Sequence, residues 1–357
     1  MTHPTRRALL GGALATLGAA GLSSLAGCSL ERASSAPTPH LRLGYFASLT
    51  HAVPMTAVAR GTVARHLGSS VPLETQVCDA GPAAVESLLA GAIDAAYLGP
   101  SPAINAHVRT KRRGIRIVAG AATGGAALVV RPGITSVKQL RGRVIATPQL
   151  GGTQDVALRT WLWNHGLRTE LTGSTDVNIV SQANSQTLDL FKAGTIDGAW
   201  LPEPWVSRLV LDAGATVLVD ERAMWPRGVF PTTVLVVMQD YLEAYPERVR
   251  SLLDAHVETV TAMRADAETA RVFVNTEIDR LVGKPLKPAV LERAWKQLDI
   301  GWDPIASAMP RLAADSVTAG ITPRLPDLTG LLDLRPLNKV LAAHGHAPVF
   351  DAGLGVS

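Results

Sequence analysis

The chain has 357 residues, of which 47% are hydrophobic and 18% are charged, and its formal net charge is +4 at pH 7. This length is enough for two domains with hydrophobic cores of their own, and the nearly even charge balance argues against a nucleic-acid-binding protein, which would present a basic face. The two cysteines, Cys28 and Cys78, are too few for a cysteine-based zinc site.

Residues 1–27 have the features of an export signal. Arg6 and Arg7 form a twin-arginine pair, and an uncharged run of small and apolar residues follows them. The run ends in Leu-Ala-Gly-Cys, which resembles the lipobox of bacterial lipoproteins and would make Cys28 the lipidated first residue of the mature chain. Residues 28–40 would then be a Ser/Ala/Pro-rich linker. The alternative is a soluble exported protein cleaved nearby, and both readings place the body outside the cytoplasm. With Cys28 modified, no disulfide within the chain is expected.

From residue 41 onward, strand and helix patterns alternate, which predicts an α/β fold with largely parallel sheets. Beyond residue 238 an amphipathic pattern starts at Pro246, and further helical runs predict a helical C-terminal extension. In chain order, strands are expected at 41–45, 71–77, 95–98, 115–121, 126–131, 143–146, 177–180, 198–201, 217–219 and 233–238, and helices at 53–68, 82–90, 102–110, 153–165 and 204–212.

One short motif occurs twice. Residues 91–98 and 194–201 both have the pattern G-x-I-D-x-A-aromatic-L, each after an apolar helical run and before a proline-rich elbow. The glycine suits a helix C-cap, where only glycine adopts the left-handed conformation without a steric cost. The spacing is too long for a solenoid repeat and fits one compact lobe, so we infer two similar lobes. Two ordinary helix-turn-strand units that are alike by chance are the alternative.

Motifs of the common catalytic and cofactor-binding sites are missing from the mature sequence. It contains no G-x-S-x-G elbow, P-loop, H-E-x-x-H, strand-linked G-x-G-x-x-G or EF-hand loop. His344 and His346 are neighbours, but nothing near them completes a metal-ligand set. We therefore expect a protein that is not an enzyme and that has no cofactor and no metal.

Helices are expected to begin directly after strands at four points, near residues 50–51, 101–102, 152–154 and 203–205. In parallel α/β sheets such points face the crevice at the carboxyl ends of the strands. A helix N-terminus offers free backbone N–H groups and about half a positive charge, so several that face one cleft would bind a small anion. The sequence therefore predicts a site for a small anionic ligand.

Side chains near these helix starts are the candidate ligand contacts. The hydroxyl groups of Ser101, Thr153 and Thr232 or Thr233, with the amide of Gln154, could complete the hydrogen bonds, although Ser and Thr at helix starts also serve as caps. His51 could donate to an anion or simply lie in the first turn of a helix. The aromatic residues could wall the cleft or pack in the core; they are Tyr45, Phe46, Trp200 and Trp205.

The motifs taken together resemble the substrate-binding lipoproteins of ABC importers for aliphatic sulfonates, taurine and nitrate. The resemblance rests on Gly44-Tyr45-Phe46 with Leu49-Thr50-His51-Ala52, on 90–105, on 147–155 and on 196–205, and it extends over nearly the whole mature chain. It implies a type II periplasmic-binding-protein fold, in which two α/β lobes are hinged by two crossings. Lobe 1 would comprise residues 41–128 and 232–357, and lobe 2 residues 129–231.

The resemblance also implies where the ligand would bind. The ligand loops would fall at Tyr45 to His51, Gly99 to Ser101, Gly152 to Gln154, Glu203 to Trp205 and Thr232-Thr233. Glu203 would repel a pure anion such as nitrate but could pair with the ammonium group of an aminosulfonate. Alternatively, Glu203 could latch the lobes together or point to solvent.

The expected function is that of a lipid-anchored extracytoplasmic receptor, active as a monomer, that captures a small organic oxyanion. An aliphatic sulfonate or a taurine-like compound is the expected ligand, and an ABC permease with its ATPase is the expected partner. The alternatives are a binding protein for nitrate or for a thiamine-precursor pyrimidine, a sensor lobe for a signalling partner, and an enzyme related to pyrimidine synthases of the same fold, which carry a cysteine-rich segment that this sequence lacks.

Overall fold

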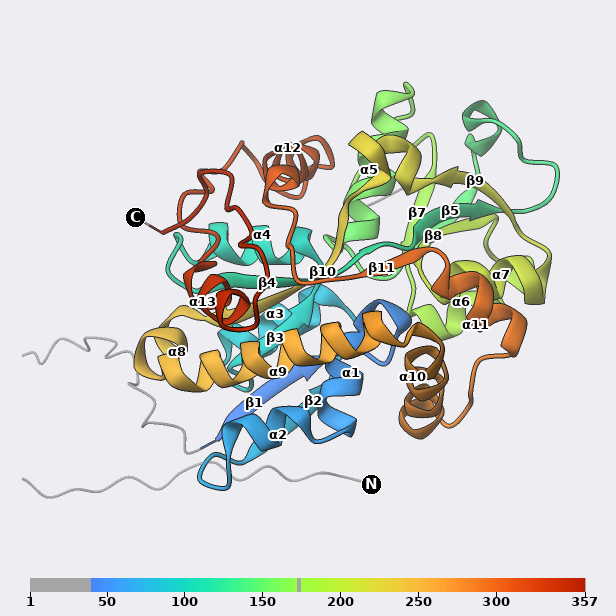
Figure 1. Ribbon diagram of the computed structural model, residues 1–357. Helices are drawn as coiled ribbons and strands as arrows, with labels where there is room; N and C mark the ends of the chain where they lie inside the picture. Colours follow the sequence, from blue (N-terminus) through green and yellow to red (C-terminus); the bar gives the residue numbers. More distant parts are fainter. Residues whose placement is uncertain (1–39, 172–174, 357) are drawn as a thin grey trace, which may run out of the picture. The chain divides into compact units, whose positions relative to one another are not determined.

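The computed structural model describes residues 40–171 and 175–356. The predicted signal at 1–27, Cys28 and nearly all of the 28–40 linker lie outside the described residues. No helix in the described ranges combines the length and the apolar character that crossing a membrane requires. The described chain is built on two β-sheets, which we call sheet A and sheet B (Figure 1).

Sheet A has the strand order β2-β1-β3-β10-β4-β11, and sheet B has the order β7-β6-β8-β5-β9. Sheet A consists of β1 (Leu41–Tyr45), β2 (Leu73–Val77), β3 (Ala95–Leu98), β4 (Ile115–Gly124), β10 (Pro231–Met238) and β11 (Leu298–Ile300). Sheet B consists of β5 (Ala126–Val130), β6 (Val144–Thr147), β7 (Asn178–Ser181), β8 (Gly198–Pro202) and β9 (Thr216–Asp220).

Most strands in each sheet run in one direction, as predicted, but both sheets are mixed and not purely parallel. In sheet A, β10 runs antiparallel to both β3 and β4, and in sheet B, β5 runs antiparallel to both β8 and β9. These two strands follow the points where the chain passes from one sheet to the other, at Gly124-Gly125 and between β9 and β10. Each enters its new sheet from the side where the other strands end, so it runs in the opposite direction.

The helices fall close to the predicted ranges. They are α1 (Ala52–Ala59), α2 (Thr62–Leu67), α3 (Gly81–Leu89), α4 (Pro100–Arg109), α5 (Thr153–Asn164), α6 (Asn184–Lys192), α7 (Trp205–Ala213), α8 (Gln239–Ala244), α9 (Pro246–Ala265), α10 (Ala267–Val282), α11 (Pro288–Trp295), α12 (Met309–Thr318) and α13 (Arg335–Ala343), with short 3-10 helices that include η1 (Leu49–His51) and η3 (Glu221–Met224).

The C-terminal extension contacts elements of both sheets. Its helix α9 packs against α2 and α13, α11 packs against α7, and α12 lies against both α4 and α5 (Figure 1). Two elements of the extension are not among those predicted: β11, which pairs with β4 in sheet A, and the late helix α13. The extension is therefore part of the body that joins the two sheets. The lobe boundaries at 128/129 and 231/232 stay a prediction.

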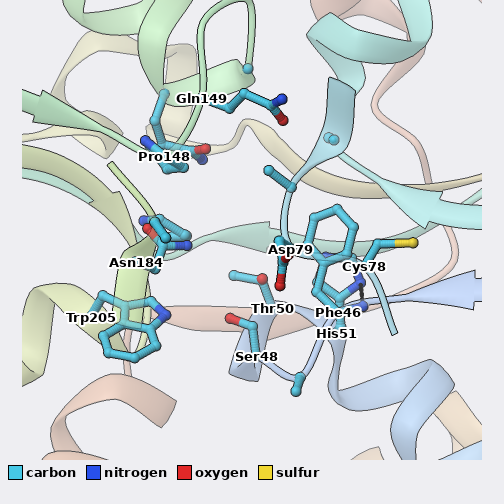
Figure 2. Close-up of a pocket in the computed structure, with 18 of the residues that line it drawn as sticks. Phe46, Ser48, Thr50, His51, Cys78, Asp79, Pro148, Gln149, Asn184 and Trp205 are labelled. Carbon is cyan, nitrogen blue, oxygen red and sulfur yellow. Dashed lines mark hydrogen bonds between the residues drawn. The ribbon is translucent and has the colours of Figure 1, made fainter. Parts of the chain in front are cut away.

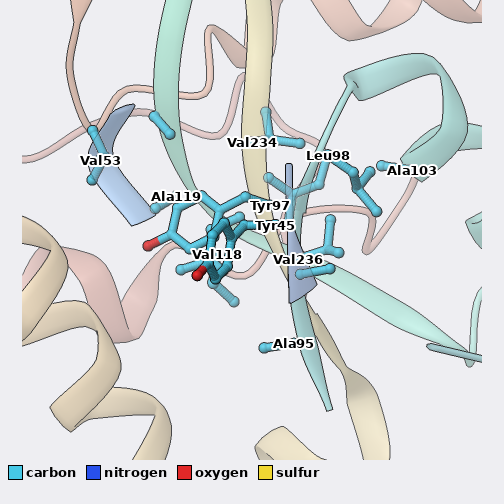
Figure 3. Packing of buried hydrophobic residues seen from close by; sticks show 14 of the residues in the cluster. Tyr45, Val53, Ala95, Tyr97, Leu98, Ala103, Val118, Ala119, Val234 and Val236 are labelled. Atoms are coloured by element: carbon cyan, nitrogen blue, oxygen red, sulfur yellow. The ribbon is translucent and has the colours of Figure 1, made fainter. Parts of the chain in front are cut away.

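Apolar side chains form one core around sheet A and two smaller cores on the faces of sheet B. Figure 3 shows Tyr45 and Tyr97 packed among valine and alanine side chains from β3, β4 and β10 in the first of these cores. Trp200 is fully buried in sheet B, where its indole Nε1 donates to Glu221 at 2.8 Å. Tyr45 and Trp200 could wall the cleft or pack in a core, and both pack in a core.

The two copies of the repeated motif occupy the same place in their sheets. The strand of the first copy is β3 and that of the second is β8, each third in the matching order β2-β1-β3-β10 and β7-β6-β8-β5. The helix before each copy ends in a left-handed glycine, Gly91 (φ +70°) or Gly194 (φ +81°), as predicted. Paired hydrogen bonds from this glycine and the next residue close the last helical turn in both copies.

The aspartate of the motif explains why the pattern recurs. The Asp94 carboxylate accepts the backbone N–H of Arg42 at 2.8 Å and pairs with the Arg42 guanidinium at 2.6 Å. The Asp197 carboxylate accepts the backbone N–H of Val144 at 2.9 Å and the guanidinium of Arg143 at 3.2 Å. Each carboxylate thus adds hydrogen bonds between the second and third strands of its sheet, β1 and β3 or β6 and β8, just before the third strand begins.

Replacing Asp94 by alanine should lower the free energy of unfolding by about 2–3 kcal/mol, because a backbone N–H and a partly buried guanidinium lose a charged acceptor. The matching change Asp197→Ala should cost less, because Arg143 is half exposed. Urea unfolding of both variants measures the two losses. Equal, negligible losses would show that the motif has no structural role.

Candidate functional site

A cavity of about 300 Å³ lies where loops and helix starts from both sheets meet. Figure 2 shows part of its lining, with Phe46, His51, Cys78 and Asp79 on one side of the view and Pro148, Asn184 and Trp205 on the other. The full lining consists of Phe46, Ala47, Ser48, Thr50, His51, Val77, Cys78, Asp79, Ala80, Gly81, Gly99, Pro102, Pro148, Gln149, Gly152, Thr153, Gln154, Ala183, Asn184, Ser185, Pro202, Trp205, Thr232, Leu281 and Val282.

Six helix starts contribute to this lining. Four are those that the sequence predicts, at η1 leading into α1 and at α4, α5 and α7. The other two are the starts of α3 and α6, which follow β2 and β7. Because backbone N–H groups in a first helical turn lack partners within the helix, the cavity is surrounded by donors and by the positive ends of helix dipoles.

Nine of the thirteen predicted ligand-binding residues line the cavity, and four do not. The four outside the lining are Tyr45, Ser101, Glu203 and Thr233, all of them buried. Tyr45 faces the core of sheet A. The nine in the lining are Phe46, Thr50, His51, Gly99, Gly152, Thr153, Gln154, Trp205 and Thr232.

Ser101 was expected to cap its helix, and this expectation is wrong. Helix α4 begins at Pro100 with Gly99 as its N-cap, so Ser101 lies inside the first turn. Proline at the first helical position has the required φ and no N–H to leave unpaired, which favours this earlier start. The Ser101 hydroxyl is fully buried and has no hydrogen-bond partner among the described residues.

The starts of α4 and α5 lie in direct contact, although the two helices follow strands of different sheets. A Cβ atom added to Gly99 would lie only 2.3 Å from the Thr153 hydroxyl oxygen, so the approach depends on glycine. The α5 start is held in place by the buried Asp155 carboxylate, which accepts from Gly151 N–H at 3.0 Å, Thr147 Oγ1 at 3.0 Å and Arg159 Nε at 3.0 Å.

Several buried polar atoms at the cavity lack a partner within the described residues. They are Thr153 Oγ1, Gln149 Oε1 and Asn184 Oδ1. An unpaired buried polar atom costs free energy, so such atoms favour a ligand that hydrogen-bonds to them. Thr232 does not belong to this set, because its hydroxyl donates to the carbonyl of Gly124.

His51 is a neutral hydrogen-bond donor in this site. Its ring stacks on Phe46 with centroids 4.1 Å apart, and its Nδ1 accepts the backbone N–H of Phe46 at 3.3 Å. Burial lowers the pKa of His51 to about 3, so the imidazole is uncharged at neutral pH. The proton of the neutral ring therefore resides on Nε2, which makes that nitrogen a donor.

Glu203 is turned away from the cavity and belongs to a buried network. Its carboxylate accepts from the backbone N–H of Ser207 at 3.0 Å, from the Ser207 hydroxyl at 2.9 Å and from Arg293 of α11 at 3.3 Å. Its backbone carbonyl accepts from the Ser48 hydroxyl at 3.0 Å, beside the cavity. The Glu203 side chain therefore joins α7 to α11 and does not line the cavity.

Burial raises the pKa of Glu203 to about 7, and the hydrogen bonds from Ser207 and the charge of Arg293 offset this only in part. In the unfolded chain this carboxyl group titrates near its ordinary value of 4.5, so the folded protein holds the proton more tightly. Its contribution to stability is therefore complete below about pH 4.5 and is lost as the pH rises through about 7.

The charges in the lining were not anticipated from the sequence. Among the described lining residues, Asp79 is the one Asp or Glu and there is no Lys or Arg. Burial raises the pKa of the Cys78 thiol to about 11, so the thiol is uncharged at neutral pH.

Several residues of the lining that were not predicted lie at two helix starts. Asp79 and Gly81 follow β2, and Asn184 and Ser185 follow β7. The rule that a helix start directly after a strand faces the cleft, applied to β2 and β7, would have predicted these four residues.

Replacing Glu203 by glutamine should remove part of the pH dependence of stability. As the pH rises from about 4.5 to about 7, the free energy of unfolding of the wild type should fall by roughly 1–3 kcal/mol relative to Glu203→Gln. Chemical denaturation across this range measures the difference. Glu221, whose pKa is also raised to about 7 by burial, is present in both proteins and cancels. Parallel pH profiles would contradict the assignment.

Comparison with known proteins identifies the family. Residues 34–276 match the model of the NMT1-like family. The taurine-binding periplasmic protein of Escherichia coli is 27% identical over 205 residues, which are 57% of this chain and 60% of that protein, so the match spans less than two thirds of that relative's length.

Solved structures share the fold. The alkanesulfonate-binding protein SsuA of Xanthomonas axonopodis pv. citri, bound to MOPS, superposes with a TM-score of 0.65 and 20% identity over 82% of this chain and 96% of its own. The periplasmic nitrate-binding protein NrtA of Synechocystis PCC 6803 superposes with a TM-score of 0.70 and 14% identity over 86% of this chain and 89% of its own. The architecture is therefore that of the periplasmic binding proteins, and the chain belongs to the NMT1-like family.

Proposed function

We propose that this protein is the extracytoplasmic substrate-binding component of an ABC importer, which captures a small organic oxyanion and delivers it to a membrane permease and its ATPase. An aliphatic sulfonate or a taurine-like compound is the proposed ligand. The observation that carries the proposal is the convergence of six helix starts on one cavity, together with the Thr153 hydroxyl, which has no partner within the described residues. The named sulfonate, taurine and nitrate binding proteins similar to this chain support it.

The cavity chemistry suits an oxyanion with a short organic tail. Backbone N–H groups at the starts of α5 and α6, the Thr153 hydroxyl and the neutral His51 ring would donate to the oxygens of the anion. The rings of Phe46 and Trp205 would pack against the organic part. Of the nine predicted site residues in the lining, Phe46, His51, Thr153 and Trp205 supply these contacts, together with backbone N–H groups at the start of α5.

Capture would work by closure of the two proposed lobes, residues 41–128 with 232–357 and residues 129–231. A ligand shifts a conformational equilibrium only through its different affinity for the two states. The cavity lining comes from loops of both sheets, so a ligand in it would contact both lobes in the closed form. The hydrogen bond from Ser48 to the carbonyl of Glu203 adds a direct contact between segments that follow β1 and β8.

The proposed location is the outer face of the cell membrane, with the monomeric protein anchored through a lipid on Cys28. The observation behind the anchor is the Leu-Ala-Gly-Cys sequence that ends at Cys28. Mass spectrometry of the membrane fraction from expressing cells would show the lipid on Cys28, and an unmodified, freely released protein would refute the anchor.

Two alternative ligands follow from particular features of the cavity. Nitrate would use the helix starts but would leave the aromatic walls without contacts, and Asp79 would repel it. A thiamine-precursor pyrimidine would use the rings of Phe46 and Trp205 for stacking and Asp79 for its amino group. A pyrimidine-synthase type of enzyme receives little support, because Cys78 is mostly buried with a raised pKa and is a poor nucleophile.

A thermal-shift screen should identify the ligand class. Taurine, alkanesulfonates, nitrate, sulfate and a thiamine-precursor pyrimidine would each be added to the purified protein. A cognate ligand at roughly 100 times its Kd should stabilise the protein by about 2.7 kcal/mol. A response to sulfonates is the expected result, and a response to nitrate or the pyrimidine with silence from every sulfonate would refute the proposal.

Replacing Thr153 by alanine should weaken sulfonate binding about tenfold while changing the stability little, because Thr153 lines the cavity and its hydroxyl has no partner within the described residues. Thr160 on the same helix is the matched control, since its hydroxyl donates to the carbonyl of Asp315 at 2.9 Å. Thr160→Ala should lower stability and leave affinity unchanged. Calorimetric titration with chemical denaturation separates the two effects, and equal losses in both variants would make Thr153 a purely structural residue.

A further inference from the structure

The cavity has an unusual charge balance for a site that binds an anion. Asp79 contributes a carboxylate, and no lysine or arginine is found among the described lining residues. His51 adds no positive charge, because its buried ring is neutral at neutral pH. The positive potential comes from helix starts alone, each worth about half a charge near the first turn.

Asp79 has no partner that would explain its presence as a structural residue. It lies between β2 and α3, its side chain is exposed, and its carboxylate makes no hydrogen bond or ion pair with any described residue. Its position just before α3 gives it a favourable interaction with that helix dipole, but the same charge cancels the attraction of this helix start for an anion. The anion should therefore bind at the other helix starts.

The starts of α4, α5 and α6 have the features of an anion site. Thr153 is 95% buried, since its relative exposure is 5%, and its hydroxyl has no partner within the described residues. This hydroxyl lies against Gly99, where the starts of α4 and α5 meet. In Figure 2 Asp79 is labelled beside Phe46 and Thr50, whereas Asn184 and Trp205 lie across the view. Asp79 thus lies across the labelled part of the lining from Asn184, at the start of α6.

We propose that Asp79 is a specificity-determining residue that binds a cationic group of the ligand, so that the cognate ligand is a zwitterion such as an aminosulfonate. The sulfonate would bind at the starts of α5 and α6, and the ammonium group would pair with Asp79. This inference rests on the proposed function. Selection against simple alkanesulfonates follows, because a ligand of net negative charge would meet the Asp79 carboxylate without a compensating cation.

The test compares two ligands that differ only at the terminal group. Taurine and 1-propanesulfonate have the same number of heavy atoms in the chain, with an ammonium group in one and a methyl group in the other. Calorimetric titration of both into the wild-type protein and into Asp79→Asn gives four affinities. The wild type should prefer taurine by at least about tenfold, and Asp79→Asn should reduce this preference to about threefold or less.

Asp240→Asn is the matched control, because Asp240 is an exposed carboxylate in the first turn of α8 and is not part of the lining. It removes the same charge from the protein and should leave the preference for taurine unchanged. The thermal unfolding of each variant shows that it is folded, as expected for an exposed side chain without partners.

The outcomes separate this inference from the proposed function. If 1-propanesulfonate binds as tightly as taurine to the wild type, or if Asp79→Asn leaves the preference intact, Asp79 does not select the ligand, while the sulfonate function stands. If neither sulfonate binds and the pyrimidine does, the sulfonate function fails and this inference fails with it. A preference that falls equally in Asp79→Asn and Asp240→Asn would show a general charge effect and overturn the assignment to Asp79.

Discussion

The structure depends on two strands, one in each sheet, that run antiparallel to both of their neighbours. β5 and β10 each occupy the fourth position of their sheet and pair on both sides, so each sheet is completed by a strand that the chain reaches only after crossing. Sheet B is built from the continuous segment 126–220, but sheet A also needs β10 and β11, which the chain reaches only after sheet B. The crossings therefore set the ends of the two sheets near each other, and the loops at those ends supply the cavity lining.

This arrangement explains how a cavity with no lysine or arginine in its described lining could hold an anion. Parallel strands release their helices at one edge, and each helix start presents unpaired N–H groups there. The contact between Gly99 and Thr153 brings starts from both sheets together, and the Asp155 network keeps one of them rigid. Backbone donors fixed in this way need little reorganisation on binding, which favours affinity without formal charge.

The carboxylates near the cavity have different roles because their surroundings differ. Glu203 is buried and bonded to Ser207 and Arg293, so it joins α7 to α11 of the C-terminal extension. Asp79 is exposed and unbonded within the described residues, so it is available to a ligand. In our proposal a carboxylate in the cleft favours an aminosulfonate over nitrate. That carboxylate belongs to Asp79 and not to Glu203.

By itself the sequence determined the elements and their repetition. Hydrophobic periodicity placed most strands and helices, and the G-x-I-D motif predicted two equivalent units, because its glycine and aspartate act on neighbours close in the chain or in the adjacent strand. Helix starts after strands likewise predicted four of the six helix starts at the cavity, since that rule is local. The sequence also lacks the common catalytic motifs.

Only the tertiary structure decided strand direction and side-chain orientation. Periodicity is the same for a strand that runs either way, so the reversed β5 and β10 could not be inferred from it. Helix α4 starts at Pro100, because proline prefers the φ of a first helical residue. Ser101 therefore lies in the first turn and does not cap the helix. Glu203 faces away from the cavity and pairs with Arg293, which lies 90 residues from it along the chain. Such long-range pairing leaves no local signal in a single sequence.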